Sequence, residues 1–417
     1  MSRRQKSLKK QDFGSRAVAL LSDMGYWLTA DIEVGNQGKR SIDSRSLDLF
    51  GIRFDQMFTP HRIAADCSSL ESNSDSDQLL RLRGLSDYLS ADTAFFIRPK
   101  LHPHCRALAS KLDIRVLDID AISQLEAKRV KSKLVDFAKY SHMLSDYHRN
   151  DLVDDDVRVA IRQIDRYLSY GFWSVEFHRN LFILIDMYAT RRHLLKPENA
   201  ASIEVAFSGA ERYAFCLLEM ARSVVSSNLE DLRKQSRVFL HGGSLALRDK
   251  ERLFSLLREL TGTNEQPDPS WLNDQLELLV RLLFHPIGAC DVLRHLAAMR
   301  SLSIQKGTNT KSLDNASAKS APGSNFPRKA RKPSLLILPN CVERDVQLIL
   351  PAGQQSTKSN GASVMQPDVN TQSEEEEEEE EELSDNTEAI ILAKHIAFSF
   401  CDITGINPEL FSTIRSY

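Results

Sequence analysis

The sequence predicts an α/β domain, with a mixed central sheet flanked by helices, followed by a mostly α-helical domain. Up to about residue 120, short apolar runs typical of strands alternate with helical segments. Strands joined through helices pair in parallel or in a mixed sheet. From about residue 121 to 302, apolar residues recur at helical spacing alone. The 417 residues are enough for two or three domains.

The α/β region begins with a predicted helix over residues 13–25. Phe13, Leu20 and Leu21 fall at helical spacing, and Gly25 is well placed to end the helix. The remaining elements, in chain order, are strands at 26–34, 47–54 and 62–67, a helix at 78–89, a strand at 94–97, a helix at 102–112 and a strand at 114–117.

The rest of the chain divides by composition. A helical domain is expected at 121–304, and linkers are expected where Lys, Ser, Pro or an unbroken acidic run replaces apolar periodicity. The predicted units are a basic flexible arm (1–12), the α/β domain (13–120), the helical domain (121–304), a basic linker (305–333), a short strand pair (334–351), a disordered linker with the acidic run Glu374 to Glu382 (352–387) and a C-terminal docking segment (388–417).

The net charge of −3 hides an uneven distribution. The first sixteen residues carry six cations, among them Arg3, Arg4, Lys9 and Lys10, against the single acid Asp12. A basic arm favours a polyanionic partner such as DNA or RNA. A purely solubilising role accounts for the same pattern.

Cysteine usage and hydropathy exclude several classes of protein. The six cysteines are scattered, without a CxxC pair or a His/Cys cluster at zinc spacing. We therefore expect free thiols and a cytoplasmic location. The sequence has no apolar run of about 18 residues, the length that a membrane span needs. We expect no membrane association.

Two carboxylates lie on consecutive predicted strands. Asp48 shares its strand face with the apolar Phe50 and Ile52, which draws it toward the buried side of the sheet. An ionised carboxylate is costly there unless it is paired or bound to a metal. Asp66 ends the next strand, so the two acids converge if the strands are neighbours. Two carboxylates and a backbone carbonyl suit Mg²⁺, which activates water for attack on a phosphodiester.

These strands resemble the PD-(D/E)XK restriction-endonuclease-like superfamily, especially the catalytic domains of methyl-directed restriction enzymes. The matching segments within residues 13–120 are AVALLSDMGY (17–26), SLDLFGI (46–52), IAADCSS (63–69) and the region from Ala94 that ends in DIRVLD. The resemblance implies an endonuclease fold with Asp48 as the first acid, Asp66 as the second and a lysine position at Ser68. It also implies a role in a bacterial restriction or anti-phage system.

The chain departs from the family pattern at Ser68, because serine carries no cation. Losing a group that stabilises transition-state charge costs about 10²–10³ in rate. Some members of the superfamily place the cation on the following helix, where Gln78 and Arg81 lie three residues apart on one face. The residues of such a rebuilt catalytic site are Asp48, Asp66, Gln78 and Arg81, with Mg²⁺ on the two aspartates.

Three functions remain open on these residues. The first is nucleic-acid binding by a degenerate endonuclease-like domain, whose cations would contact the phosphate backbone. These cations are Arg3, Arg4, Lys9, Lys10, Arg81 and Arg83. The second is an active Mg²⁺-dependent endonuclease with a displaced catalytic cation. The third is a non-catalytic scaffold that binds a protein partner through the helical domain or the C-terminal segment.

Overall fold

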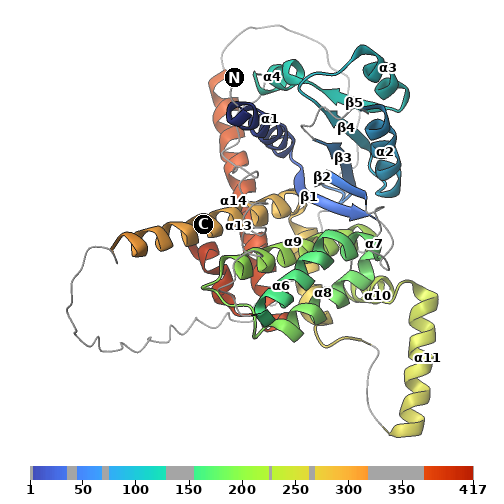
Figure 1. Cartoon of the computed structure of the whole chain (residues 1–417). Coiled ribbons are helices and arrows are strands. Elements are labelled where there is room, and N and C mark those ends of the chain that lie inside the picture. The colour runs from blue at the N-terminus through green and yellow to red at the C-terminus, as the bar shows by residue number, and fades with distance from the viewer. Residues whose placement is uncertain are drawn as a thin grey trace, which may run out of the picture.

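A computed structural model describes residues 3–34, 45–67, 75–127, 155–224, 228–262, 268–317 and 371–416. Its N-terminal part is a sheet with helices on both faces (Figure 1). The elements of this part are α1 (Arg3–Asp23), β1 (Trp27–Val34), β2 (Arg45–Phe54), β3 (Pro60–Asp66), α2 (Asp75–Tyr88), β4 (Thr93–Ile97), α3 (Pro103–Lys111), β5 (Ile114–Leu117) and α4 (Ile119–Ala127).

The five strands form one mixed sheet in the order β1-β2-β3-β4-β5. β2 pairs antiparallel with both β1 and β3. β4 pairs parallel with both β3 and β5. The parallel pairs require crossovers, which α2 and α3 provide. The predicted mixed sheet flanked by helices is therefore confirmed.

Both faces of the sheet are covered, because apolar side chains point to each side along the strands. On one face Leu28 and Leu49 pack in a cluster with α1 and α4. Arg16 on α1 also pairs with Glu126 on α4 at 2.6 Å. On the opposite face Phe50 belongs to a larger core that α2 and the helical part share.

The remainder of the described chain is helical, as the sequence predicts. Its elements are α6 (Asp155–Arg166), η2 (Tyr167–Gly171), α7 (Phe172–Ser174), α8 (Phe177–Arg191), α9 (Ala200–Ser223), α10 (Leu229–Leu240), α11 (Ser244–Thr261), α12 (Leu272–Phe284), α13 (Pro286–Ser317), α14 (Thr371–Thr404) and η3 (Pro408–Ser416).

Helix α9 lies at the centre of the molecule. Every residue from Glu204 to Ala221 is buried, since α9 packs against α8, α12, α13, α14 and η3. Phe215 carries the contact to the sheet, with its ring centroid 6.2 Å from that of Trp27 and 5.8 Å from that of Phe54. A helix that is buried on all sides belongs to the core, and its charged residues then need partners from the elements around it.

Charged side chains on α9 are buried with partners from other elements. Glu211 is 1% exposed, accepts a hydrogen bond from Trp27 Nε1 at 3.0 Å and lies 3.2 Å from Arg300 Nε. Arg212 donates to Thr29 Oγ1 at 2.7 Å. Because Trp27 and Thr29 are on β1 and Arg300 is on α13, these contacts join the sheet to two helices.

Glu219 adds a second buried link near the end of α9. Arg62 on β3 donates to its carboxylate at 2.9 Å, and Arg222 one turn later lies 2.9 Å from its other oxygen. The carboxylate is thus held between a strand and its own helix. Both links bind the helical part to the sheet.

The C-terminal segment lies against the helical part. Phe400 on α14 stacks edge-on with Tyr188, with centroids 5.0 Å apart. Phe411 in η3 contacts Phe207 on α9, with centroids 4.6 Å apart. Phe400 and Phe411 are both fully buried.

Several boundaries differ from the sequence-based ones. α1 begins at Arg3, so residues 3–12 are helical rather than a flexible arm, and α4 extends the α/β part beyond residue 120. α13 and α14 run into the two expected linkers. Lys, Arg, Gln and Glu are good helix formers, so a helix anchored by its apolar half continues through polar sequence. The expected strand pair at 334–351 lies outside the described residues.

Replacing Phe215 with alanine tests whether the sheet and the helical part unfold together. The loss of a buried aromatic ring should cost about 3–5 kcal/mol in the free energy of unfolding. Urea denaturation, followed by far-ultraviolet circular dichroism and by tryptophan fluorescence, should show one shifted transition. Leu80→Ala, on the exposed surface of α2, serves as the control. Two separated transitions in the wild-type protein would contradict this coupling.

Candidate functional site

The register between β2 and β3 brings the two predicted acids together. Leu49 pairs with Ala65, so the next step along the antiparallel register sets Asp48 opposite Asp66. Directly opposite side chains lie on the same face of a sheet. The carboxylate of Asp66 accordingly raises the pKa of Asp48, in addition to the larger effect of burial.

The cation at this site is Arg98, which the sequence analysis did not single out. It follows β4 directly, and its guanidinium donates through Nη2 to Asp66 Oδ1 at 2.6 Å. Arg98 is 4% exposed and stacks over the ring of Phe96 at 3.9 Å. β3 and β4 are parallel, so their carboxyl ends meet at one edge of the sheet. This geometry explains why a residue 32 positions away reaches Asp66.

Both Nη groups of the Arg98 guanidinium are engaged in hydrogen bonds. Its Nη1 donates to the carbonyl oxygens of Asp66 and Ile97 at 3.2 and 2.8 Å. Its Nη2 donates to Gln78 Oε1 at 2.5 Å as well as to Asp66. The Nε lies 3.8 Å from a carboxylate oxygen of Asp75. All four Nη hydrogens therefore have acceptors. The guanidinium links β3, β4 and α2 through these hydrogen bonds.

The predicted residues of α2 separate into two roles. Gln78 and Arg81 face the acids: Gln78 accepts from Arg98, and the charge of Arg81 lowers the pKa of Asp48. Arg83 lies elsewhere on the helix, donates to the carbonyl oxygen of Leu112 at 3.2 Å and pairs with Asp87. Ser68 lies outside the described residues.

Asp48 itself is held by the backbone. Its Oδ2 accepts a hydrogen bond from the Cys67 amide at 2.9 Å. Burial and the neighbouring Asp66 raise its pKa, and these effects outweigh the amide and the two arginines. Burial and the two aspartates raise the pKa of the Cys67 thiol, which disfavours the thiolate form that a nucleophile needs.

The residues present do not fit Mg²⁺. The Arg98 guanidinium is bound to both the carbonyl and a carboxylate oxygen of Asp66, so a second cation beside it would meet like charge. Among the residues that the structure describes, no group of three or more His, Cys, Asp or Glu is arranged to hold a metal ion. The carboxylate of Asp66 is paired with Arg98 instead.

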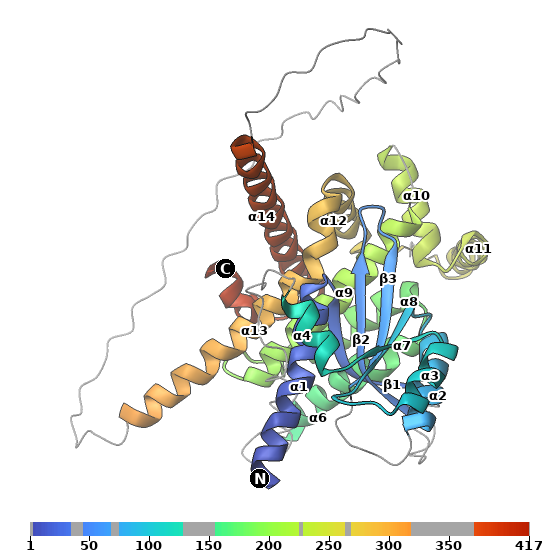
Figure 2. The same cartoon turned by 90° about the horizontal axis from the view of Figure 1, so that it is seen from above.

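The remaining predicted cations lie on α1. Arg3, Arg4, Lys9 and Lys10 fall in its first turns, and Figure 2 shows this end of the helix pointing away from the sheet. They lie at the end of α1 opposite to the end that leads into β1.

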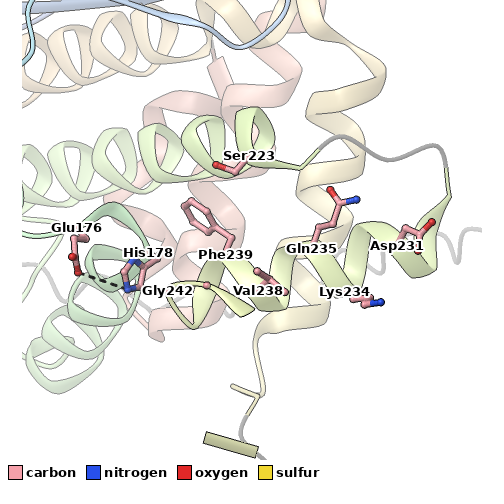
Figure 3. Close-up of a pocket in the computed structure, with 10 residues that line it drawn as sticks. Glu176, His178, Ser223, Asp231, Lys234, Gln235, Val238, Phe239 and Gly242 are labelled. Carbon is pink, nitrogen blue, oxygen red and sulfur yellow. Dashed lines mark ion pairs between the residues drawn. The ribbon is translucent and has the colours of Figure 1, made fainter. Parts of the chain in front are cut away.

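A second concave region lies between α8 and α10, with a volume of about 680 Å³ (Figure 3). Its polar lining includes His178, which lies 3.9 Å from Glu176, and Lys234. Burial lowers the pKa of His178. The turn at Gly242 borders this region as a loop between two helices, and the lining residues hold no nucleophile paired with an oriented base.

Two further findings concern membrane-spanning helices and similarity to known proteins. No helix in the described ranges is long and apolar enough to cross a bilayer. Comparisons with protein-family models, with curated proteins and with solved structures found no match.

A signal for Arg98 was present in the sequence. A cation directly after the buried run Phe95 to Ile97 stands at the carboxyl end of a strand, beside Pro99, which ends it. Its partner could not be assigned because the choice between Asp48, Asp66 and Asp75 depends on strand order.

Replacing Arg98 with alanine tests whether its hydrogen bonds to β3, β4 and α2 stabilise the fold. It leaves the buried Asp66 carboxylate without its main cation, and this loss should cost about 3–5 kcal/mol in the free energy of unfolding. Adding Asp66→Asn to that variant should recover part of the loss. The control is Arg83→Ala, which breaks an exposed pair and should cost less than about 1 kcal/mol. Urea denaturation measures the free energy of unfolding of each variant. Equal losses of stability in Arg98→Ala and Arg83→Ala would show that the buried contacts of Arg98 do not stabilise the fold more than an exposed pair does.

Replacing Asp48 with asparagine tests the raised pKa. Native Asp48 binds its proton more tightly than the unfolded chain does, so wild-type stability falls as the pH rises from the ordinary aspartate pKa of about 3.9 through the raised native pKa. Asparagine keeps an acceptor for the Cys67 amide and removes this dependence. Asp48→Asn should therefore be more stable than wild type at neutral pH, and the difference should shrink in acid. A pH-independent difference would contradict the assignment.

Proposed function

We propose that this protein binds nucleic acid through an endonuclease-like α/β domain that no longer carries out metal-dependent hydrolysis. The observation that supports this best is the Arg98 guanidinium bound to Asp66, opposite Asp48 on neighbouring strands. The acids stand at the positions that the resemblance implies for a nuclease. In this protein their hydrogen bonds to Arg98 and to the Cys67 amide stabilise the fold.

Hydrolysis by this arrangement would lack its usual groups. Arg98 cannot act as a base, and its Nη hydrogens are committed to Asp66, Ile97 and Gln78. Asp66 is committed to Arg98, and Asp48 to the Cys67 amide. A nuclease of this type instead needs a metal ion to activate water and to neutralise charge on the phosphate.

Binding of a polyanion is supported by the charges on α1. Its first three turns carry five cations and no acid through residue 10. α1 is anchored at its other half by Phe13, Ala17, Leu20 and Leu21 on the sheet. This anchorage gives the basic turns a fixed direction from the α/β domain, and phosphate contacts need no particular base sequence.

Nucleic-acid binding is tested by changing Arg3, Arg4, Lys9 and Lys10 together to alanine. Wild-type protein should bind duplex or single-stranded DNA or RNA at low salt. If each cation neutralises one phosphate of duplex DNA, the variant should lower the slope of log affinity against log salt by about 3–4. Fluorescence anisotropy titrations from about 50 to 200 mM salt measure this change.

The matched control removes four exposed cations from the helical part. Arg179, Arg192, Lys196 and Arg233 are exposed, and their change to alanine alters the net charge by the same amount. The control should keep the wild-type slope. If both variants lower the slope equally, binding depends on net charge alone and not on α1. If the wild type binds none of the probes, the proposal is refuted.

Loss of hydrolysis is tested separately. Plasmid DNA and RNA should remain uncut with Mg²⁺ or Mn²⁺, and Asp66→Ala should behave as the wild type. Cleavage that Asp66→Ala abolishes would instead establish an active nuclease.

A further inference from the structure

An apolar stripe runs along the outer side of α11. Leu253, Leu256, Leu257 and Leu260 follow the spacing i, i+3, i+4 and i+7, which sets them on one side of a helix. Their exposed fractions are 53%, 49%, 38% and 82%. Leu245, at the start of the helix, is also exposed. Exposed apolar patches of this kind mark interaction sites more often than bare surface.

The base of α11 is fixed to the protein, whereas its second half projects. Leu247 is buried, and Glu251 pairs with Arg237 at 2.9 Å. Arg237 also pairs with Asp268, just before α12, at 2.8 Å. Figure 1 shows α11 reaching away from the body, beyond α10. The stripe is thus presented at a defined angle.

We propose that the α11 stripe binds the same stripe of a second copy of this chain, with the two helices antiparallel. A twofold axis near the middle of the stripe sets Leu253 opposite Leu260 of the second copy and Leu256 opposite Leu257. The interface is self-complementary and closes at two copies. It covers Leu253, Leu256, Leu257 and Leu260 of both chains at once.

The charges beside the stripe favour this orientation. Arg252 and Glu259 are seven residues apart, hence on the same flank of α11, and both are exposed. In an antiparallel pair the same flanks meet, so Arg252 of each copy faces Glu259 of the other. Such flanking pairs set partner choice and orientation in helix pairs.

A parallel pair is disfavoured by Asp249. This residue lies on the apolar side of the helix, one turn before Leu253. Parallel packing would set it against its own copy, where like charges repel. In the antiparallel register the position opposite Asp249 falls beyond Thr261, the last residue of the second copy's α11.

A membrane surface fits the stripe less well. Interfacial helices are rich in Lys and Arg on the polar face. In α11 the charges alternate in sign from Arg248 to Arg252. Interspersed charges of both signs are typical of a solvent-exposed helix with salt bridges, such as the outer positions of a coiled coil.

The test is the mass of the full chain in solution, measured by sedimentation equilibrium over a wide range of protein concentration. Wild-type protein should pass from monomer to dimer. Leu253→Glu combined with Leu260→Glu should remain monomeric, with an unchanged circular dichroism spectrum because both residues are exposed. Leu80→Glu, at a comparably exposed leucine on α2, should still dimerise. A wild-type monomer at every concentration, or a dimer of the double variant, would overturn the proposal.

Charge reversal tests the orientation. Arg252→Glu and Glu259→Arg should each weaken dimerisation by about tenfold or less, as expected for an exposed pair. The two changes together should restore it, because the reversed charges again face each other. Dimerisation that stays weak in the combined variant would overturn the antiparallel register. None of these readouts depends on nucleic-acid binding.

Discussion

Buried ion pairs along α9 hold the sheet and the helical part of this molecule together. Each charge taken out of water costs several kcal/mol unless a partner and further hydrogen bonds meet it. Glu211 meets this condition through Trp27 and Arg300, and Glu219 through Arg62 and Arg222. The partners come from β1, β3 and α13. The two carboxylates therefore keep their partners only when these elements hold this position relative to α9.

Arg212 shows how closely that placement is constrained. Burial lowers the pKa of its guanidinium to about 10, which still leaves it charged at neutral pH. It donates to Thr29 and stacks over the rings of Trp27 and Trp173. Moving the sheet away from α9 would remove Thr29 and Trp27, the β1 partners of Arg212 and Glu211, and would leave these two charges without those contacts. Substitutions at this contact should therefore act on both parts of the fold.

The same physical rule operates at the Asp48–Asp66 pair, with a different consequence for function. There the compensating cation is Arg98, fixed by four hydrogen bonds to three residues. An acidic pair of this kind could hold a metal ion in an open site, but here it is closed by protein. The two interactions proposed above use the basic end of α1 and the leucines of α11, and neither proposal includes these acids.

The sequence by itself determined the features that depend on local period. Alternation along β2 placed Asp48 on the face of Phe50, and apolar spacing predicted a helical region after residue 120, because both patterns repeat over a few residues. Tertiary structure alone decided which charges meet. Arg98 lies 32 residues from Asp66 and Trp27 lies 184 residues from Glu211. Such pairs depend on strand order and helix placement, which minimise the cost of burying charge over the whole molecule, and no local pattern encodes them.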